Sequence, residues 1–463
     1  MIFSSLTFFL FFLIYFLTNL FFPSRYRNYL IIIGSTIFYA WWKLDEVWVP
    51  FLISIVGLFG AKIIDNESRQ RKKYFLWITL FLIFSPLFIF KYQGFFYNEL
   101  FVPIFGLKEK VFNNSIPLGI SFISFTVTSY VVDVFRNKFT SDISLKTFLA
   151  YIMFFPQLIA GPVLRPNELI PQLNNPKPIS LDNSFYPIFL FTIGLVKKII
   201  FADYLASFVE PVFNNNLVTL NSLEIVLGVY SFAIQIYCDF SGYTDMAIAL
   251  SLMLGINLPI NFSKPYFSKS IIEFWRNWHI TLSNFLRDYL YIPLGGNKNG
   301  FLFQSRNILF TMLIGGLWHG ANWTFLFWGL MHAIALIFVR IFDKINSNKI
   351  KFNKFFSTFI TFNFVTLTWI FFRAKSISQA FQIVRQTFLR ELPNLNEFVN
   401  EYYFPISLII IFFILHNWDE INIIKEFVKR FRIEILMPLT ILLWILSVSF
   451  ASSSSGAFIY FDF

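Results

Sequence analysis

The sequence contains few residues that ionise and few that could bind a metal. Charged residues make up 14% of the 463-residue chain, which has four histidines and a single cysteine, Cys238. One cysteine excludes an intrachain disulfide framework and any metal site built from several thiolates. His319 and His332 lack the i, i+4 spacing of a helical zinc site, and the chain has no P-loop and no G-x-G-x-x-G pattern. We therefore expect no bound metal and no permanently bound cofactor.

Apolar residues make up most of the chain. Hydrophobic residues account for 56% of it and aromatic residues for 21%, and apolar runs close to the ~20 residues needed to cross a membrane recur along it. The formal net charge is +11, but the basic residues fall in short loops between apolar runs, where they set the topology and meet anionic lipid rather than nucleic acid. The composition predicts an all-α polytopic membrane protein.

The apolar runs predict about twelve spanning helices in one membrane domain, residues 1–463. The first 22 residues lack a basic start, so we expect a spanning helix there rather than a cleavable signal peptide. Basic loops such as 340–354 and 425–432 are expected in the cytoplasm, which places both chain ends, including the tail 452–463, outside. The predicted spans are residues 1–22, 28–42, 47–62, 75–90, 116–135, 185–201, 224–258, 305–318, 323–339, 355–372, 403–418 and 435–451.

Residues 147–171 depart from this simple pattern. The segment begins apolar and is then interrupted by one glycine and four prolines, Pro156, Pro162, Pro166 and Pro171. Non-helical backbone at membrane depth is tolerated only where it is buried in protein or lines a wet cavity. We therefore expect a re-entrant segment here.

Residues 271–290 have the pattern of an amphipathic helix. Trp275, Trp278 and His279 fall on one face at helical spacing, and Glu273 and Asn277 fall on another. Such a helix is too polar to be surrounded by lipid, so it is expected at the membrane interface or along an internal cavity. His279 is then either a histidine whose neighbours satisfy its hydrogen bonds or a ligand or catalytic group.

The phrase Trp318-His319-Gly320 gives the strongest indication of chemistry. A histidine in apolar surroundings is kept largely neutral, which leaves one ring nitrogen able to accept a proton, as a general base requires. Ionisable residues within a membrane segment usually mark function, so we predict a functional role for His319. Asn322 and backbone amides near Gly320 are candidate oxyanion donors. His332, 13 residues further on, is either a structural hydrogen-bonding residue or a catalytic one.

Two carboxylates, Asp239 and Asp245, lie in another apolar segment. Six residues apart, they face different directions on a helix and do not form a shared dyad. Each is expected to pair with a basic residue such as Arg276 or Arg287, or to line a polar cavity.

The chain resembles the membrane-bound O-acyltransferase (MBOAT) family, and in particular its bacterial branch of alginate and peptidoglycan O-acetylation proteins. The resemblance is carried by EFWRNWHITLSNFLRDYLYIPLGGN at 273–297 and RNILFTMLIGGLWHGANWTFLFWGLMH at 306–332. It extends to YCDFSGYTDMAIALSLMLGINLPINFSKPY at 237–266, PQLIAGPVLRP at 156–166 and the terminal FIYFDF. It therefore covers most of the chain.

The resemblance implies an MBOAT-like helical fold and an O-acetyltransferase of the bacterial inner membrane. Members pass an acyl group, usually from cytoplasmic acetyl-CoA in this branch, to an extracytoplasmic acceptor pathway. The resemblance implies that His319 is the catalytic base, that His279 lies towards the donor, and that Tyr460 of the tail carries the acyl group transiently. Asp462 stands where the branch commonly has glutamine, a mild departure. A periplasmic SGNH-type acetyltransferase partner and a polysaccharide acceptor are also implied.

These interpretations together give a set of candidate site residues and leave alternative functions open. Catalysis is assigned to His319, His279 and Tyr460, and substrate contact is expected at Trp318, Asn322, Asp239, Arg276 and His332. A transporter or flippase of lipid-linked sugars would equally have broken helices and buried polar groups, although the sequence shows no inverted repeats. A structural subunit of a polysaccharide secretion complex is a third possibility. The acceptor is open between alginate, peptidoglycan and another glycan.

Overall fold

The structure is a computed structural model, and it describes residues 1–112, 115–158, 161–177, 179, 185–214, 217–345 and 353–451. Those residues form helices, turns and loops and include no strand, which confirms the predicted all-α fold class. The chain divides into two units, the first made of residues 1–188 and 246–259 and the second of residues 189–245 and 260–463. The single-domain organisation stays a prediction.

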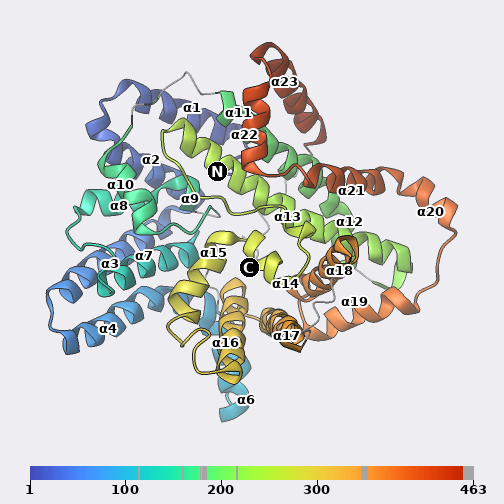
Figure 1. Cartoon of the computed structure of the whole chain (residues 1–463), viewed down its shortest axis with the longest axis horizontal. Helices are drawn as coiled ribbons and strands as arrows, with labels where there is room; N and C mark the ends of the chain where they lie inside the picture. The colour runs from blue at the N-terminus through green and yellow to red at the C-terminus, as the bar shows by residue number, and fades with distance from the viewer. Residues whose placement is uncertain are drawn as a thin grey trace. The chain divides into compact units, whose positions relative to one another are not determined.

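The first unit contains the N-terminal helices. Helices α3, α4 and α7 lie side by side in it (Figure 1), and α4 continues through π-helical turns as far as Phe105. Its helices are α1 (Leu6–Phe21), α2 (Arg27–Trp42), α3 (Trp48–Asn66), α4 (Arg69–Leu87), α5 (Gln93–Phe96), α6 (Val102–Phe105), α7 (Ile120–Phe135), α8 (Leu145–Met153), α9 (Phe155–Leu158) and α10 (Pro166–Asn174).

The second unit holds the candidate site. Two helices contribute to both units, α11 (Phe185–Val196) and α13 (Ser222–Met253), and a π-helical turn, Lys197–Asp203, follows α11. The other helices of this unit are α12 (Tyr204–Asn214), α14 (Ile271–Asn277), α15 (Ile280–Leu286), α16 (Phe301–His319), α17 (Trp323–Ile345), α18 (Lys354–Arg373), α19 (Ile377–Leu389), α20 (Leu395–Glu401), α21 (Tyr403–His416), α22 (Ile421–Arg430) and α23 (Ile433–Phe450).

Seven helical stretches in the described part of the chain are long and apolar enough to cross a membrane. An eighth results if α20 and α21, which are bent by 79° at their junction, count as one span. Helices α1 and α7 are apolar but have 16 residues each, short of the ~20 that a perpendicular span needs. The predicted number of twelve spans stays a prediction.

The proline-rich segment 147–171 is broken, as its sequence predicts. Helices α8, α9 and α10 are short, and the described residues between them are largely buried. The hydroxyl of Tyr151 donates to the carbonyl of Leu164 at 2.9 Å, so the segment folds back on itself. The amide of Phe155 donates to the hydroxyl of Ser35 on α2 at 3.1 Å. Irregular backbone is thus buried in protein; its re-entry into the membrane stays a prediction.

The prediction of one amphipathic helix over 271–290 was wrong. The chain leaves the helical conformation between α14 and α15, where His279 adopts a left-handed φ of 43°. Asn261 explains the break, because its carbonyl accepts from the amide of Ile280 at 2.9 Å and its side chain contacts the His279 ring. These tertiary contacts override a helical pattern that is continuous in the sequence.

Two glycines bring the backbones of α16 and α17 into direct contact. A Cβ on Gly316 would lie 2.3 Å from the carbonyl oxygen of Phe325, and one on Gly329 would lie 2.4 Å from that of Met312. Neither oxygen can move without disturbing its helix. Helices α16 and α17 therefore form a tight hairpin (Figure 1). His319, the last residue of α16, lies at its turn.

We expect Gly316→Ala to destabilise the protein by about 1–3 kcal/mol, because the added methyl group overpacks two helix backbones. The neighbouring Gly315→Ala is the matched control, since its Cβ would meet only the end of the Leu286 side chain, at 3.2 Å. Thermal unfolding of both purified variants in the same detergent compares them. Equal midpoints for the two variants would contradict the close packing assigned to Gly316.

Candidate active site

His319 is the last residue of α16 and lies in an aromatic pocket. Its side chain is buried, with 4% of the residue exposed. Its ring centroid lies 4.9 Å from that of Trp318, 5.3 Å from that of Trp328 and 5.2 Å from that of Phe372. The chain leaves α16 in extended conformation at Gly320, where a Cβ would come within 2.0 Å of the Phe325 ring. Glycine is therefore required directly after His319.

Asn322 shapes the turn between α16 and α17. Its side-chain oxygen accepts from the amide of Thr324 at 3.0 Å, which caps the first turn of α17. Its side-chain amide donates to the carbonyl of Lys375 at 3.1 Å. Both ends of the side chain thus hold in place the turn that carries His319. A role of Asn322 as an oxyanion donor stays a prediction.

His279 is fully buried near His319. Its Nδ1 lies 3.1 Å from Oδ1 of Asn261, which also accepts from the amide and hydroxyl of Thr281 at 3.2 and 3.0 Å. An amide oxygen only accepts, so Nδ1 carries the proton and Nε2 carries the lone pair. Burial lowers the pKa of His279 to about 3, which keeps the ring neutral at physiological pH.

Trp318 joins the two histidines. Its ring centroid is 6.2 Å from that of His279 and 4.9 Å from that of His319, and Phe240 of α13 packs edge-on against His279 at 4.7 Å. The structure therefore brings three of the predicted site residues, His279, Trp318 and His319, into one aromatic cluster.

His332 is held by a chain of hydrogen bonds. Its Nδ1 accepts from the indole N–H of Trp275 at 3.3 Å, and its Nε2 lies 3.0 Å from the hydroxyl of Thr368. That hydroxyl donates to the carbonyl of Val365 at 2.7 Å, so its oxygen accepts from Nε2–H. Both ring nitrogens are thus engaged in a neutral imidazole. His332 also packs against Trp328 at 4.7 Å, and so supports the pocket of His319 from behind.

Asp239 and Asp245 of α13 are buried and belong to ion pairs. Asp239 pairs with Lys198 at 2.8 Å and Asp245 with Lys197 at 2.7 Å. The predicted pairing of each carboxylate with a basic residue is confirmed, but the partners are these lysines and not Arg276 or Arg287. Arg276 is exposed on α14, and Arg287 contacts Asp288 at 2.6 Å. A buried carboxylate needs a partner that is itself buried, and the two lysines meet that condition.

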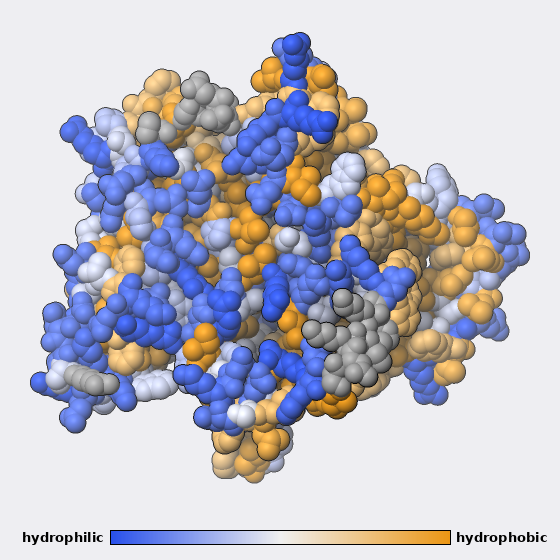
Figure 2. All heavy atoms as spheres, in the orientation of Figure 1, coloured by the Kyte–Doolittle hydropathy of each residue, from blue (hydrophilic) through white to orange (hydrophobic). Residues whose placement is uncertain are grey.

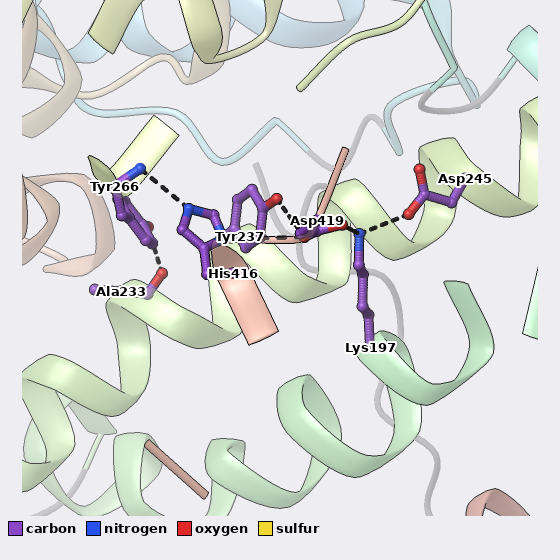
Figure 3. A network of polar contacts seen from close by, with 7 residues as sticks. All are labelled: Lys197, Ala233, Tyr237, Asp245, Tyr266, His416 and Asp419. Carbon is purple, nitrogen blue, oxygen red and sulfur yellow. Dashed lines mark hydrogen bonds and ion pairs between the residues drawn. The ribbon is translucent and has the colours of Figure 1, made fainter. Parts of the chain in front are cut away.

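A polar network that the sequence analysis missed surrounds Lys197 (Figure 3). Its ammonium contacts Asp419 as well as Asp245, and Asp419 accepts from the hydroxyl of Tyr237 at 2.6 Å. Although burial opposes it, the Lys197 ammonium holds the pKa of Asp419 below its usual range. The fourth histidine, His416, accepts from the amide of Tyr266 at 3.3 Å. Two adjacent lysines in the run FLFTIGLVKKIIFAD were the available signal.

More than half of the chain matches a known protein family. Residues 117–378 match the model of the MBOAT, membrane-bound O-acyltransferase, family, and this segment contains His279, His319 and His332. The chain belongs to the membrane-bound O-acyltransferase family. It is therefore an acyltransferase, and its apolar helices make it a multi-pass membrane protein.

Several bacterial relatives of this MBOAT protein are acyltransferases by name. The chain is 40% identical over 400 residues to a probable alginate O-acetylase of Azotobacter vinelandii, covering 84% of this chain and 78% of the relative. It is 38% identical to a peptidoglycan O-acetyltransferase of Helicobacter pylori, covering 77% and 72%. A teichoic acid D-alanyltransferase of Streptococcus thermophilus is 27% identical, covering 66% and 77%.

A cavity of about 1010 Å³ lies beside α14 in this MBOAT chain. Three lysines, Lys264, Lys269 and Lys354, and two glutamates, Glu273 and Glu420, line it together with aromatic and amide side chains. Lys264 pairs with Glu420 at 2.9 Å. Asn277 also lines it, and Trp278 and His279 follow directly in the chain. The remaining predicted site residue, Tyr460, lies outside the described residues.

The buried, neutral His279 predicts a pH-dependent stability. Because its pKa of about 3 in the fold is below the ~6.5 of a free histidine, the unfolded chain binds a proton that the folded chain does not. The contribution is complete above about pH 6.5 and is lost as the pH falls towards 3, with about 2 kcal/mol lost at pH 5.

Thermal unfolding between pH 7 and pH 5 measures this contribution. In His279→Asn, which keeps a residue type that tolerates the left-handed φ, the midpoint should fall less with pH than in the unchanged protein. Identical pH profiles for the two proteins would show that His279 is not buried in its neutral form.

Proposed function

We propose that this protein transfers an acetyl group from cytoplasmic acetyl-CoA across the bacterial inner membrane, for O-acetylation of an extracytoplasmic polysaccharide. The observation that carries the proposal is the buried His319, held between Trp318, Trp328 and Phe372. A second buried histidine, His279, packs against the same Trp318. The names of the alginate and peptidoglycan relatives support an acetyl group and a glycan acceptor.

The proposed chemistry is general-base acyl transfer. An acceptor hydroxyl attacks the thioester carbonyl, and His319 takes the hydroxyl proton as the new C–O bond forms. The C–S bond then breaks, and the proton passes to the departing thiolate, so the products are an acetyl ester and free coenzyme A. The aromatic rings around His319 exclude water, which limits hydrolysis of the thioester.

The cavity beside α14 is a suitable approach for the donor. Coenzyme A carries phosphate groups, and the three lysines of the cavity wall outnumber its two glutamates, which leaves a net positive charge there. The basic segment 340–354 is predicted to be cytoplasmic. Lys354 belongs to this segment and also lines the cavity. Between this cavity and His319 lie the rings of Trp278, Trp369 and Trp328, packed at 5.0 and 5.8 Å, so the donor thioester would have to pass this aromatic layer.

Transfer towards the acceptor would take place through the C-terminal tail. Tyr460 would accept the acetyl group as a phenolic ester and pass it to a periplasmic SGNH-type acetyltransferase, which would modify the polysaccharide. The predicted topology places residues 452–463 outside, where such a partner could reach them.

We expect His319→Ala to abolish acetylation, with a loss of at least about 100-fold, because a positioned general base contributes 10²–10⁴-fold. Release of coenzyme A from labelled acetyl-CoA by the purified protein measures the activity. Membrane level and thermal midpoint of the variant serve as the folding control. Activity retained in a folded His319→Ala would refute the assignment, and sugar uptake into vesicles without coenzyme A release would favour a transporter.

A variant that lacks the phenol oxygen of Tyr460 tests the proposed role of this residue as the acetyl carrier. Tyr460→Phe should abolish labelling of the protein by acetyl-CoA, because the phenol that would accept the acetyl group is gone. Tyr403→Phe, at an exposed tyrosine of α21, is the matched control and should label normally. Mass spectrometry of the tail peptide detects the ester, and full labelling of Tyr460→Phe would exclude this residue as the carrier.

A further inference from the structure

A second cavity of the C-terminal unit has no part in the proposed reaction. It has a volume of about 280 Å³ and lies between α11, α21, α22 and α23. Aliphatic and aromatic side chains form most of its wall, among them Ile193, Ile424, Leu439 and Leu443. The volume is just below the ~300 Å³ at which pockets for small molecules begin. It is too small for coenzyme A and suits a single hydrocarbon chain.

The two charged residues in the lining of this cavity do not make it polar. Lys197 and Asp419 belong to its lining, but the lysine ammonium is turned towards its two carboxylates (Figure 3). The second oxygen of Asp419 accepts from Tyr237. Their charges are thus engaged with one another, and the wall of the cavity consists mostly of carbon atoms. A polar ligand would gain few hydrogen bonds in exchange for those it gives up with water.

Helix α22 brings positive charge to the edge of the same cavity. Ile423, Ile424 and Phe427 of this helix line the cavity, while Lys425, Lys429 and Arg430 are exposed. In Figure 2, hydrophilic atoms lie over α22 and hydrophobic atoms over the adjoining α23. A helix with one apolar and one basic face lies at a membrane interface, where it attracts anionic lipid.

The basic charge on α22 is in excess. Lys425, Lys429, Arg430 and the adjoining Arg432 stand against one acid within the helix, Glu426, which pairs with Lys429 at 2.8 Å on the exposed surface. Exposed pairs of this kind contribute little and leave the other cations available. The apolar face of α22 therefore suits an acyl chain, and its basic face suits a negatively charged head group.

We propose that this cavity binds one acyl chain of an anionic phospholipid, whose phosphate contacts the basic side of α22. The chain would fill the space between α11 and α23, which are joined by a hydrogen bond from Trp444 to Thr192 at 2.8 Å. The lipid would thereby stabilise the position of α22 and α23 against α11. This site is independent of the proposed acetyl transfer.

Thermal unfolding of the purified full chain in a neutral detergent tests the proposal. Adding phosphatidylglycerol should raise the midpoint by about 3–5 °C, whereas the zwitterionic phosphatidylcholine should not. Equal shifts with the two lipids would overturn the role of the basic face. If neither lipid changes the midpoint, the proposed site is refuted.

Variants separate the chain from the head group. Leu443→Trp fills the cavity and should abolish the phosphatidylglycerol shift, whereas Ile445→Trp, at an outward position 57% exposed on the same helix, should keep it. If Leu443→Trp fails to fold, the smaller change Leu439→Phe takes its place. A full shift in the folded cavity variant would place the acyl chain elsewhere and refute the proposal.

The double variant Lys425→Gln/Arg430→Gln should lose most of the lipid shift. Lys73→Gln/Lys138→Gln removes two exposed lysines from the other unit and should keep it. Native mass spectrometry gives an independent readout. It should detect bound phosphatidylglycerol on the unchanged protein and on the control variants, but not on the cavity variant or on Lys425→Gln/Arg430→Gln. Loss of the lipid from both double variants would show that overall charge, not this site, retains it.

Discussion

Two consecutive lysines buried in an apolar region impose the main constraint on the C-terminal unit. Moving an ammonium group out of water costs several kcal/mol unless carboxylates surround it. Lys197 is therefore held by Asp245 and Asp419, and Lys198 by Asp203 and Asp239. These four acids come from the turn after α11, from α13 and from the segment after α21, so the three parts of the chain must meet.

The same constraint reaches the candidate active site by a short path. Asp419 follows α21 by three residues, and its contact with Lys197 fixes the end of that helix. His416, at that end, accepts from the amide of Tyr266. The ring of Tyr266 packs against that of Trp278, with their centroids 6.0 Å apart. Trp278 directly precedes His279 in the chain. Charge neutralisation around Lys197 thus contributes to the position of a histidine that has no charge of its own.

The sequence predicted those features that depend on local composition. Helices such as α2 and α17 lie where apolar runs of the right length occur, and His319 stood out because a titratable ring in an apolar run is rare. The break at His279 could not be predicted, since the helical pattern continues through it and Asn261, 18 residues away, causes it. The partners of Lys197 were also beyond prediction, because Asp419 is separated from it by 222 residues.

The contact of backbone with backbone in the α16–α17 hairpin has a consequence for movement. Helix α17 has 23 residues, which corresponds to about 34 Å at ~1.5 Å per residue. With Gly316 and Gly329 in contact, neither helix can slide or rotate against the other without steric overlap. The hairpin therefore moves as one body, and His319 keeps its position relative to both helices.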